Sequence, residues 1–198
     1  MKNIADDDQE EQLVHDPLRF YDKLNIRLLK TRTIVVCTSV SAEDEPFFTK
    51  LNYLVSEDSK APITVILNCP GGDVYDGFVI HNAILRARSQ GTPVNVEVLG
   101  LCASMANIVL QAGTRRIAWK STRFLLHEVS KFKFFDESTA TQAEEEAREL
   151  GKLNTMLAQI IADRVKKPID EVLKAIKKNE LWLSAEEALI YGLVDEVK

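Results

Sequence analysis

The sequence is poor in the residues that build disulfide frameworks and metal centres. It has 3 cysteines among 198 residues, and no two of them form a C-x-x-C pair: Cys37, Cys69 and Cys102. This spacing argues against both a disulfide framework and a zinc site, so we expect free thiols and no bound metal. The glycines form no nucleotide-binding loop, and no flavin motif occurs. We therefore predict a protein without a cofactor.

Positive charge and long hydrophobic runs are also scarce. Lys and Arg number 25 against 30 Asp and Glu, which gives a net charge of −5. A surface with this balance does not attract the phosphates of nucleic acid, so we expect no nucleic-acid partner. No segment approaches the roughly 20 apolar residues that cross a bilayer. Residues 1–11 are acidic, whereas a secretory signal is basic and then apolar, so we predict a cytoplasmic protein with no membrane partner.

The remaining composition is that of an ordinary folded domain. Hydrophobic residues make up 45% and charged residues 28%, close to the averages of soluble globular proteins. A chain of this length buries most of its apolar surface as one domain. The N-terminal residues are the exception, because they are rich in acidic side chains and have little to bury. We predict a flexible acidic segment at 1–16 and one folded domain at 17–198.

Apolar strands alternate with helices along the folded part. Asp16 and Pro17 are typical of a helix start, and β-branched runs such as residues 33–38 are typical of strands. The pattern predicts helices at 17–30, 74–89 and 136–166, a helix beginning after Ser41, and strands at 33–38, 63–68, 94–99, 116–119 and 123–127. Ser184 and Glu187 form a capping box, which predicts a short helix from Ser184 to Gly192. Such alternation is typical of a parallel sheet with both faces covered, so we predict an α/β fold.

Ser104 lies at the junction of a predicted strand and a predicted apolar helix, within residues 100–106 (GLCASMA). The first N–H groups of a helix are unpaired and stand at its positive end, so they favour negative charge that develops on a nearby carbonyl oxygen. The spacing differs from the G-x-S-x-G elbow of α/β-hydrolases. A serine between small residues is more often packed or capping than catalytic, so this segment alone leaves both interpretations open.

Two glycines, Gly71 and Gly72, follow another predicted strand and precede a predicted helix. Paired glycines leave backbone N–H groups free and allow a ligand to approach closely. A simple tight turn is the alternative interpretation. The pair is therefore a second candidate element of a binding site.

A serine nucleophile needs a base, and the sequence offers only 3 histidines. His15 lies beside the acidic segment and His81 in the middle of a predicted helix, so we expect polar surface roles for both. His127 ends a strand that follows the Ser104 helix, which makes it the best candidate for the base. A structural role for His127 is the alternative, because most histidines are not catalytic.

Four segments resemble successive motifs of the Clp protease proteolytic subunit (ClpP) family, in family order. They are NCPGGDVYDGF (68–78), GLCASMAN (100–107), RFLLH (123–127) and LWLSAEEALIYGLVD (181–195). The segment LLKTRTIVV (28–36) is similar to the family's first helix-to-strand junction, so the resemblance covers about residues 21–197. It implies a ClpP/crotonase-like fold, with a parallel sheet core and a protruding strand-helix handle at about 129–166.

The resemblance also implies a role for each candidate catalytic residue. Ser104 corresponds to the family's nucleophile and His127 to its base. The backbone N–H groups of Gly72 and Met105 correspond to the oxyanion hole. The third member of the family's triad, normally aspartate, falls on Glu180. Glutamate can orient an imidazole, but its extra methylene changes the position of the carboxylate.

The function implied by the resemblance is that of a serine endopeptidase that cleaves unfolded or extended polypeptides, through an acyl-enzyme, inside the chamber of an oligomeric ring. Substrate would bind along Gly71, Gly72, Glu128 and Val129, the last two of which replace the family's glutamine and proline. The handle interlocks two rings in the family, so the implied partners are further copies of the chain in stacked heptameric rings and an AAA+ unfoldase. The run KFKFF (131–135) would pair there as an edge strand.

Three other functions are compatible with the sequence. GGDV and WLSAEEA are also similar to segments of ClpP-related phage head maturation proteases, which share the catalytic plan. Glu180 in the place of aspartate leaves open a catalytically weak or silent ring subunit. A crotonase that acts on acyl thioesters shares the fold and uses two backbone N–H groups, yet it needs no Ser–His pair.

Overall fold

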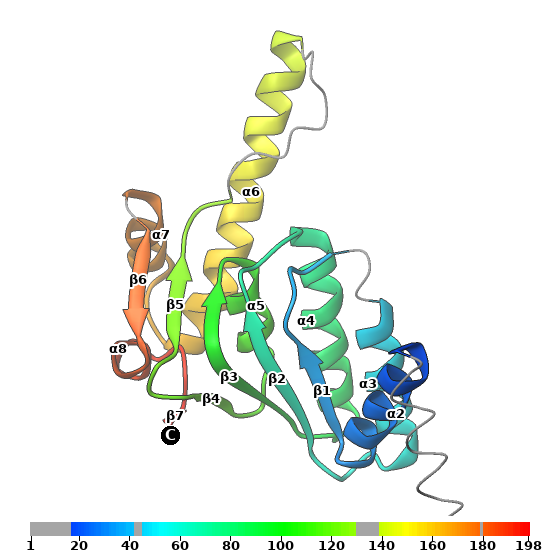
Figure 1. Cartoon of the computed structure of the whole chain (residues 1–198). Coiled ribbons are helices and arrows are strands. Elements are labelled where there is room, and N and C mark those ends of the chain that lie inside the picture. The colour runs from blue at the N-terminus through cyan, green and yellow to red at the C-terminus, as the bar shows by residue number, and fades with distance from the viewer. Residues whose placement is uncertain (1–16, 42–44, 130–138, 179) are drawn as a thin grey trace, which may run out of the picture.

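Within residues 17–41, 45–129, 139–178 and 180–198, which the computed structural model describes, seven strands form one mainly parallel sheet (Figure 1). They are β1 (Thr33–Val36), β2 (Ile63–Cys69), β3 (Val94–Ala103), β4 (Arg116–Ala118), β5 (Arg123–Leu126), β6 (Leu181–Ser184) and β7 (Glu196–Val197). β1, β2, β3, β4 and β7 lie in that order and pair in parallel. β5 pairs in parallel with the end of β3 and antiparallel with β6.

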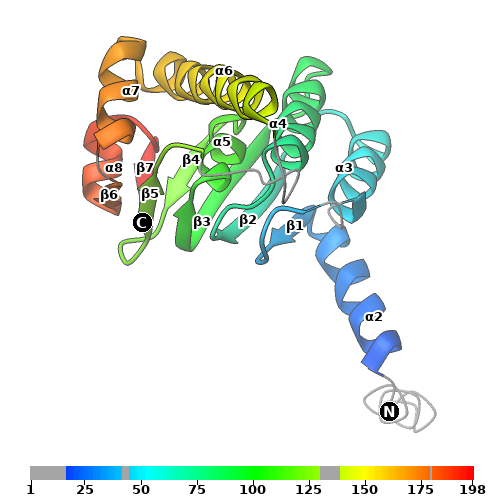
Figure 2. The same cartoon turned by 90° about the horizontal axis from the view of Figure 1, so that it is seen from above.

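Helices cover one face of this sheet. The described helices are α2 (Pro17–Lys30), α3 (Glu45–Glu57), α4 (Val74–Ser89), α5 (Met105–Gln111), α6 (Ala140–Val165), α7 (Ile169–Lys178) and α8 (Ala185–Tyr191). α3, α4, α5 and α6 lie on the same side of the sheet (Figure 2). Val65 of β2, Val96 of β3 and Ile84 of α4 are fully buried in the core between the two layers.

The opposite face of the sheet is only partly covered by the described residues, so the prediction that both faces are covered is wrong for this face. Along β2 every second side chain is buried, and those between them are half-buried or exposed. Val35, Leu99 and Trp119 are 40%, 43% and 45% exposed. A short run of Val, Ile and Leu has the same sequence pattern whether one or both faces are buried, which explains the error.

Most predicted elements occur at the predicted positions. α2 and α4 have the predicted bounds. The predicted capping box of α8 is also confirmed: the Ser184 hydroxyl accepts the Glu187 N–H, and the Glu187 carboxylate accepts the Ser184 N–H at 2.7 Å. The sequence pattern did not predict α7, β6 or β7, and the strand predicted at 94–99 extends to residue 103 as β3. β6 and β7 are short strands that form by pairing with β5 and β4, and a local pattern encodes such pairing weakly.

α6 extends beyond the sheet (Figure 1). Thr139 and Gln142 form a capping box at its N-terminus. Its buried side chains begin only at Leu153, so the preceding turns add nothing to the hydrophobic core. A helix is therefore present over Ala140–Val165 of the predicted range 136–166.

Some sequence predictions lie outside the described residues, namely the acidic segment 1–16, His15 and the strand at 131–135. The cysteines are free thiols, and only Cys37 is exposed. In the described ranges, no three His, Cys, Asp or Glu side chains are grouped so that they could hold a metal ion. No helix in the same ranges is both long and apolar enough to span a membrane.

A buried arginine joins the end of α5 to the C-terminal edge of the sheet. Arg116 has only 7% of its side chain exposed, and it donates to Gln111 Oε1 at 2.6 Å and to the Gly192 carbonyl at 2.9 Å. Its guanidinium also pairs with the Asp195 carboxylate, which accepts the Arg116 backbone N–H at 2.8 Å. Partial burial raises the pKa of the Asp195 carboxyl, but the hydrogen bonds from Arg116 outweigh it and hold that pKa below its usual range.

Asp195→Asn removes the charge that compensates Arg116, and we expect it to lower the free energy of unfolding at pH 7 by about 2 kcal/mol. Because the folded pKa of Asp195 is lowered, its contribution is complete above the unfolded pKa of about 3.9 and is lost as the pH falls through the folded value. Urea unfolding should therefore separate the two proteins at pH 7 and bring them together as the pH falls through the folded pKa of Asp195.

The control is Glu196→Gln, at an ion pair with Arg115 whose two side chains are 59% and 38% exposed. It should change the free energy of unfolding by less than about 0.5 kcal/mol. A difference between wild type and Asp195→Asn that stays constant down to low pH would contradict the assigned charge interaction.

Candidate active site

Ser104 lies between β3 and α5 in a backbone conformation that L-residues rarely adopt. Its φ is 54° and its ψ is −125°, and it is the N-cap residue of α5. A serine at this position ordinarily accepts a helix N–H with its hydroxyl. Here the Asn107 N–H donates to the Ser104 backbone carbonyl at 3.0 Å, and the Ser104 side chain makes no capping hydrogen bond. The hydroxyl is therefore available for another use, at a turn whose strain costs about 1–3 kcal/mol.

Gly71 and Gly72 allow the loop after β2 to approach Ser104 more closely than a side chain would permit. A Cβ on Gly71, which has a φ of 102°, would lie 2.6 Å from the Ser104 Cβ. A Cβ on Gly72 would lie 2.0 Å from the Val40 carbonyl oxygen, because Gly72 and Val40 form a parallel β-bridge. Close contact with two other segments therefore requires glycine at both positions.

His127 follows β5, and the pairing of β5 with β3 brings it to the same end of the sheet as Ser104. Ala103 pairs with Leu125, and the Ser104 N–H donates to the Leu125 carbonyl at 2.8 Å. Nδ1 of His127 lies 2.5 Å from the Glu128 carbonyl oxygen. A carbonyl can only accept a hydrogen bond, so Nδ1 carries the proton and Nε2 of the neutral ring is an acceptor.

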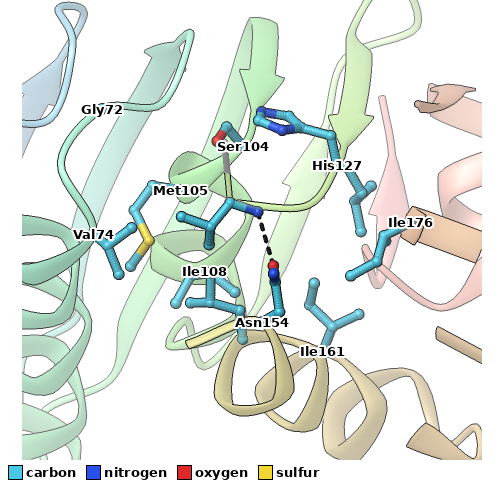
Figure 3. A pocket seen from close by; sticks show the side chains of 12 residues that line it. Gly72, Val74, Ser104, Met105, Ile108, His127, Asn154, Ile161 and Ile176 are labelled. Carbon is cyan, nitrogen blue, oxygen red and sulfur yellow. Dashed lines mark hydrogen bonds between the residues drawn. The ribbon is translucent and has the colours of Figure 1, made fainter. Parts of the chain in front are cut away.

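Ser104 and His127 line one pocket of about 110 Å³, and the imidazole points toward Ser104 (Figure 3). Gly72, Met105 and Val129, which the sequence analysis also selected, lie in the same lining. The rest of the wall is apolar apart from one amide: Val74, Ile108, Leu126, Leu157, Ile161 and Ile176, with Asn154. The fold thus places a hydroxyl and an imidazole beside an apolar cavity.

Asn154 of α6 holds the segment that follows His127. Its side-chain oxygen accepts the Val129 N–H at 2.8 Å (Figure 3). The Val129 N–H is therefore already paired within the chain, and Glu128 is half-buried outside the pocket lining. Nothing in the sequence distinguishes Asn154 from the other polar residues of α6, so it was not predicted as a site residue.

Glu180 stands across the ladder from His127, but its carboxylate binds elsewhere. Leu126 pairs with Leu181 in the antiparallel β5–β6 ladder, so His127 and Glu180 are the next opposed residues in that register. The Glu180 side chain is exposed, and its Oε2 accepts the Trp182 indole N–H at 3.1 Å. It is not part of the pocket lining. The backbone thus brings Glu180 near His127, but the Glu180 side chain binds Trp182 and the His127 ring binds the Glu128 carbonyl.

A second buried amide was missed by the sequence analysis. Asn107 of α5 is fully buried, and its Nδ2 donates to the carbonyls of Cys102 at 3.2 Å, Ser104 at 3.3 Å and Leu125 at 2.8 Å. The helix was predicted to be wholly apolar. An amide in an otherwise apolar helix is the signal that could have identified this residue, because a buried amide needs partners.

His81 is buried, so the prediction of a surface role is wrong. It is 7% exposed, and its Nδ1 lies 3.1 Å from Oδ1 of Asn82. Burial lowers the pKa of the imidazole. His81 shares the buried face of α4 with Gly77 and Ile84, which stand four residues before it and three after it.

Comparison with known proteins places this chain in a family. The family model described as Clp protease matches residues 16–198. The chain belongs to the Clp protease family. This member is 33% identical over 182 residues to the ATP-dependent Clp protease proteolytic subunit 1 of Salinibacter ruber, an alignment that covers 90% of this chain and 75% of the relative. It is 32% identical over 182 residues to the ATP-dependent Clp protease proteolytic subunit of Deinococcus radiodurans, with 90% and 85% of the two chains covered.

A solved structure of a Clp protease relative has the same fold. The chain is similar to a point mutant of ClpP1 from Listeria monocytogenes, with a TM-score of 0.78 and 26% sequence identity. The similarity covers 88% of this chain and 95% of the other. The predicted family and the predicted α/β fold, with its mainly parallel sheet, are therefore confirmed.

In this Clp protease chain the pocket groups that could carry chemistry are the Ser104 hydroxyl, Nε2 of His127 and two backbone N–H groups. The N–H groups of Gly72 and Met105 donate to no acceptor within the described part of the chain. A hydroxyl, an imidazole nitrogen and unpaired backbone N–H groups are the kinds of group that acyl transfer uses as nucleophile, proton acceptor and oxyanion donors. Such a set can perform acyl transfer without a metal or cofactor.

Gly71→Ala should disturb the Ser104 turn, because the new Cβ would lie 2.6 Å from the Ser104 Cβ and 2.8 Å from the Ala103 carbonyl oxygen. We expect the free energy of unfolding to fall by about 2 kcal/mol or more in urea titrations. Gly151→Ala is the matched control, since a Cβ there, on an exposed turn of α6, meets nothing within 4 Å. It should raise the stability by about 0.5–1 kcal/mol. Equal effects of the two substitutions would contradict the close packing at Gly71.

Proposed function

We propose that this Clp protease chain is a serine endopeptidase in which Ser104 is the nucleophile and His127 is its general base. The observation that carries the proposal is the strained Ser104 turn, whose hydroxyl caps no helix and faces the same pocket as His127. A serine hydroxyl is a poor nucleophile until a base takes its proton. Nε2 of His127 is free to act as that base, because Nδ1 donates to the Glu128 carbonyl.

In the proposed reaction Ser104 Oγ forms a bond to the peptide carbonyl carbon while its proton passes to Nε2 of His127. The tetrahedral intermediate then breaks its C–N bond, and His127 gives the proton to the leaving amine, which leaves an ester on Ser104. Water attacks that ester in the same way and releases the carboxylic acid. The N–H groups of Gly72 and Met105 are the proposed donors to the oxyanion of each intermediate.

The proposed substrate is an extended or unfolded polypeptide. The Gly71–Gly72 loop lies beside Ser104 without side chains, so a peptide backbone can approach there and pair as a strand. Glu128 and Val129 are the proposed contacts on the other side, and Val129 contributes as part of the pocket wall because its N–H is bound to Asn154. The apolar wall favours an apolar side chain next to the cleaved bond.

We further propose that the chain works in stacked heptameric rings and receives its substrate from an AAA+ unfoldase. Two relatives are named as proteolytic subunits of ATP-dependent Clp proteases. The partly covered sheet face exposes Val35, Leu99 and Trp119, and the first turns of α6 add nothing to the core. An exposed apolar surface such as this sheet face is typical of an interface between subunits.

A fluorophosphonate probe should label Ser104 in the assembled protein at neutral pH, because it reacts with an activated serine hydroxyl. Tandem mass spectrometry identifies the labelled residue, and native mass spectrometry of the same sample gives the mass of the assembly. Ser104→Ala should abolish both the labelling and the cleavage of a fluorogenic peptide. Ser56→Ala is the matched control, at an exposed helix serine whose hydroxyl donates to the Tyr53 carbonyl, and it should change neither.

Two results would count against this mechanism. Peptide cleavage that persists in Ser104→Ala would show that another group is the nucleophile. An assembled wild-type protein that neither reacts at Ser104 nor cleaves peptides would favour the catalytically silent ring subunit instead. The observation behind that alternative is the Glu180 carboxylate, which binds Trp182 and not His127.

Glu180 is the proposed third member of the triad. The Glu128 carbonyl holds the tautomer of His127, but a carboxylate stabilises the imidazolium formed during the reaction more strongly than a neutral carbonyl does. The β5–β6 register supports this role, because it sets Glu180 opposite His127. In the proposed catalytic state the Glu180 side chain leaves Trp182 and pairs with Nδ1 of His127.

Glu180→Gln should lower kcat for peptide cleavage by about 100-fold or more with little change in KM, because it removes a charge that acts only when the imidazolium forms. Steady-state kinetics measure both constants. Glu186→Gln, at an exposed residue in the first turn of α8, controls for the loss of one surface charge and should leave them unchanged. A kcat for Glu180→Gln within about threefold of wild type would assign the orienting role to the Glu128 carbonyl alone.

A further inference from the structure

The buried side chain of Asn107 joins the two segments that carry Ser104 and His127. Its Nδ2 lies 3.2 Å from the Cys102 carbonyl at the end of β3 and 2.8 Å from the Leu125 carbonyl on β5. Its Oδ1 lies 3.6 Å from the Cys102 thiol, which donates to it. The side chain is fully buried and takes no part in the pocket lining. Its partners thus lie on β3, which leads into the Ser104 turn, and on β5, which leads to His127.

The Leu125 carbonyl is the point where these contacts meet. It accepts two hydrogen bonds of 2.8 Å, one from the Ser104 N–H and one from Nδ2 of Asn107. Leu125 stands two residues before His127. A shift of β5 relative to α5 would therefore move the imidazole relative to the Ser104 hydroxyl and would stretch both hydrogen bonds. Asn107 resists that shift.

Asn107 also stabilises the unusual conformation of Ser104. Both its backbone N–H, at 3.0 Å, and its Nδ2, at 3.3 Å, donate to the Ser104 carbonyl. A residue with a φ of 54° and a ψ of −125° persists only where surrounding interactions over-determine it. The backbone N–H of Asn107, which a capping hydroxyl would otherwise accept, is thus bound to the Ser104 carbonyl.

We propose that Asn107 is a positioning residue that holds the Ser104 hydroxyl in reach of His127. The inference rests on the proposed function, because it matters only if these two side chains react with substrate. Asn107 does not line the pocket, so it acts through the backbones of Ser104 and Leu125. Loss of such a residue lowers the rate of the chemical step and leaves substrate binding unchanged.

α5 supplies a matched control residue one turn further on. Gln111 is 1% exposed, its Nε2 donates to the Leu193 carbonyl at 3.3 Å, and its Oε1 accepts from Arg116 at 2.6 Å. It is a buried amide on the same helix, but it binds the C-terminal part of the chain and not the Ser104 turn. Gln111→Leu should therefore lower stability without moving the junction.

The test measures the second-order rate constant for fluorophosphonate labelling of Ser104, together with kcat and KM for peptide cleavage, in the assembled full-length chain. Asn107→Ala should lower the labelling rate and kcat by about 100-fold and leave KM within about twofold of wild type. Gln111→Leu should lower the Tm yet keep the labelling rate within about threefold of wild type. All variants are compared at a temperature at which circular dichroism shows them to be folded.

Asn107→Asp should make the labelling rate depend on pH in a way that a simple loss of stability would not. A carboxyl of the same shape can donate one hydrogen bond to these carbonyls while protonated, but it repels them once ionised. The neighbouring Cys102 thiol stays protonated, because burial raises its pKa well above the usual value. The labelling rate of Asn107→Asp relative to wild type should therefore fall as the pH rises from about 5 to about 8, at a constant folded fraction.

The outcomes separate this inference from the proposed function. Wild-type protein that does not react at Ser104 contradicts the proposed function itself. A reactive wild type with Asn107→Ala and Asn107→Asp at wild-type rates overturns only the positioning role. Equal losses in Asn107→Ala and Gln111→Leu also overturn it, since general stability would then set the rate. If Asn107→Ala does not fold, Asn107→Ser, which keeps a donor on a shorter side chain, carries the same comparison.

Discussion

The pocket depends on one hydrogen-bonded junction, where the end of β3 turns into α5 and is held against β5. The Leu125 carbonyl accepts hydrogen bonds from both the Ser104 N–H and the Asn107 side-chain amide. One carbonyl of β5 therefore binds both the Ser104 turn and α5. Because β3 and β5 run in parallel, the carboxyl ends of these two strands lie at the same end of the sheet. The carboxyl ends of parallel strands are where open α/β sheets gather ligand-binding groups. Ser104 and His127 lie together for this reason.

α5 is short and wholly buried, which explains why its two amides matter. A buried amide without partners costs stability, so each must find hydrogen bonds inside the core. Asn107 meets this need at the strained Ser104 turn, and Gln111 meets it through Arg116 at the other end. The helix is thereby tied to β5 at its start and to the C-terminal segment at its end. These hydrogen bonds at the two ends of α5 hold the packing around Ser104 in place and so offset the strain in its backbone.

The proposed acid lies on a less constrained part of the molecule than the proposed nucleophile and base. β6 pairs only with β5 within the described residues, and Glu180 precedes its first residue. The side chain is exposed and bound to Trp182, whereas Ser104 and His127 stand on a well-packed core. The first turns of α6 and one face of the sheet are likewise left open by this chain. Ser104 and His127 thus follow strands that pack in the core, whereas Glu180 lies at the surface.

Local chemistry was enough to predict much of this protein. Pro17 and the apolar spacing set the bounds of α2, the box at Ser184 set the start of α8, and ordered motifs identified the family that the comparisons confirm. The tertiary structure alone decided that His81 is buried, that one sheet face is open, and that Asn107 binds three carbonyls from two segments. The reason is physical: capping and periodicity act between residues a few positions apart, whereas burial and long-range hydrogen bonds depend on the register of strands that a local pattern does not encode.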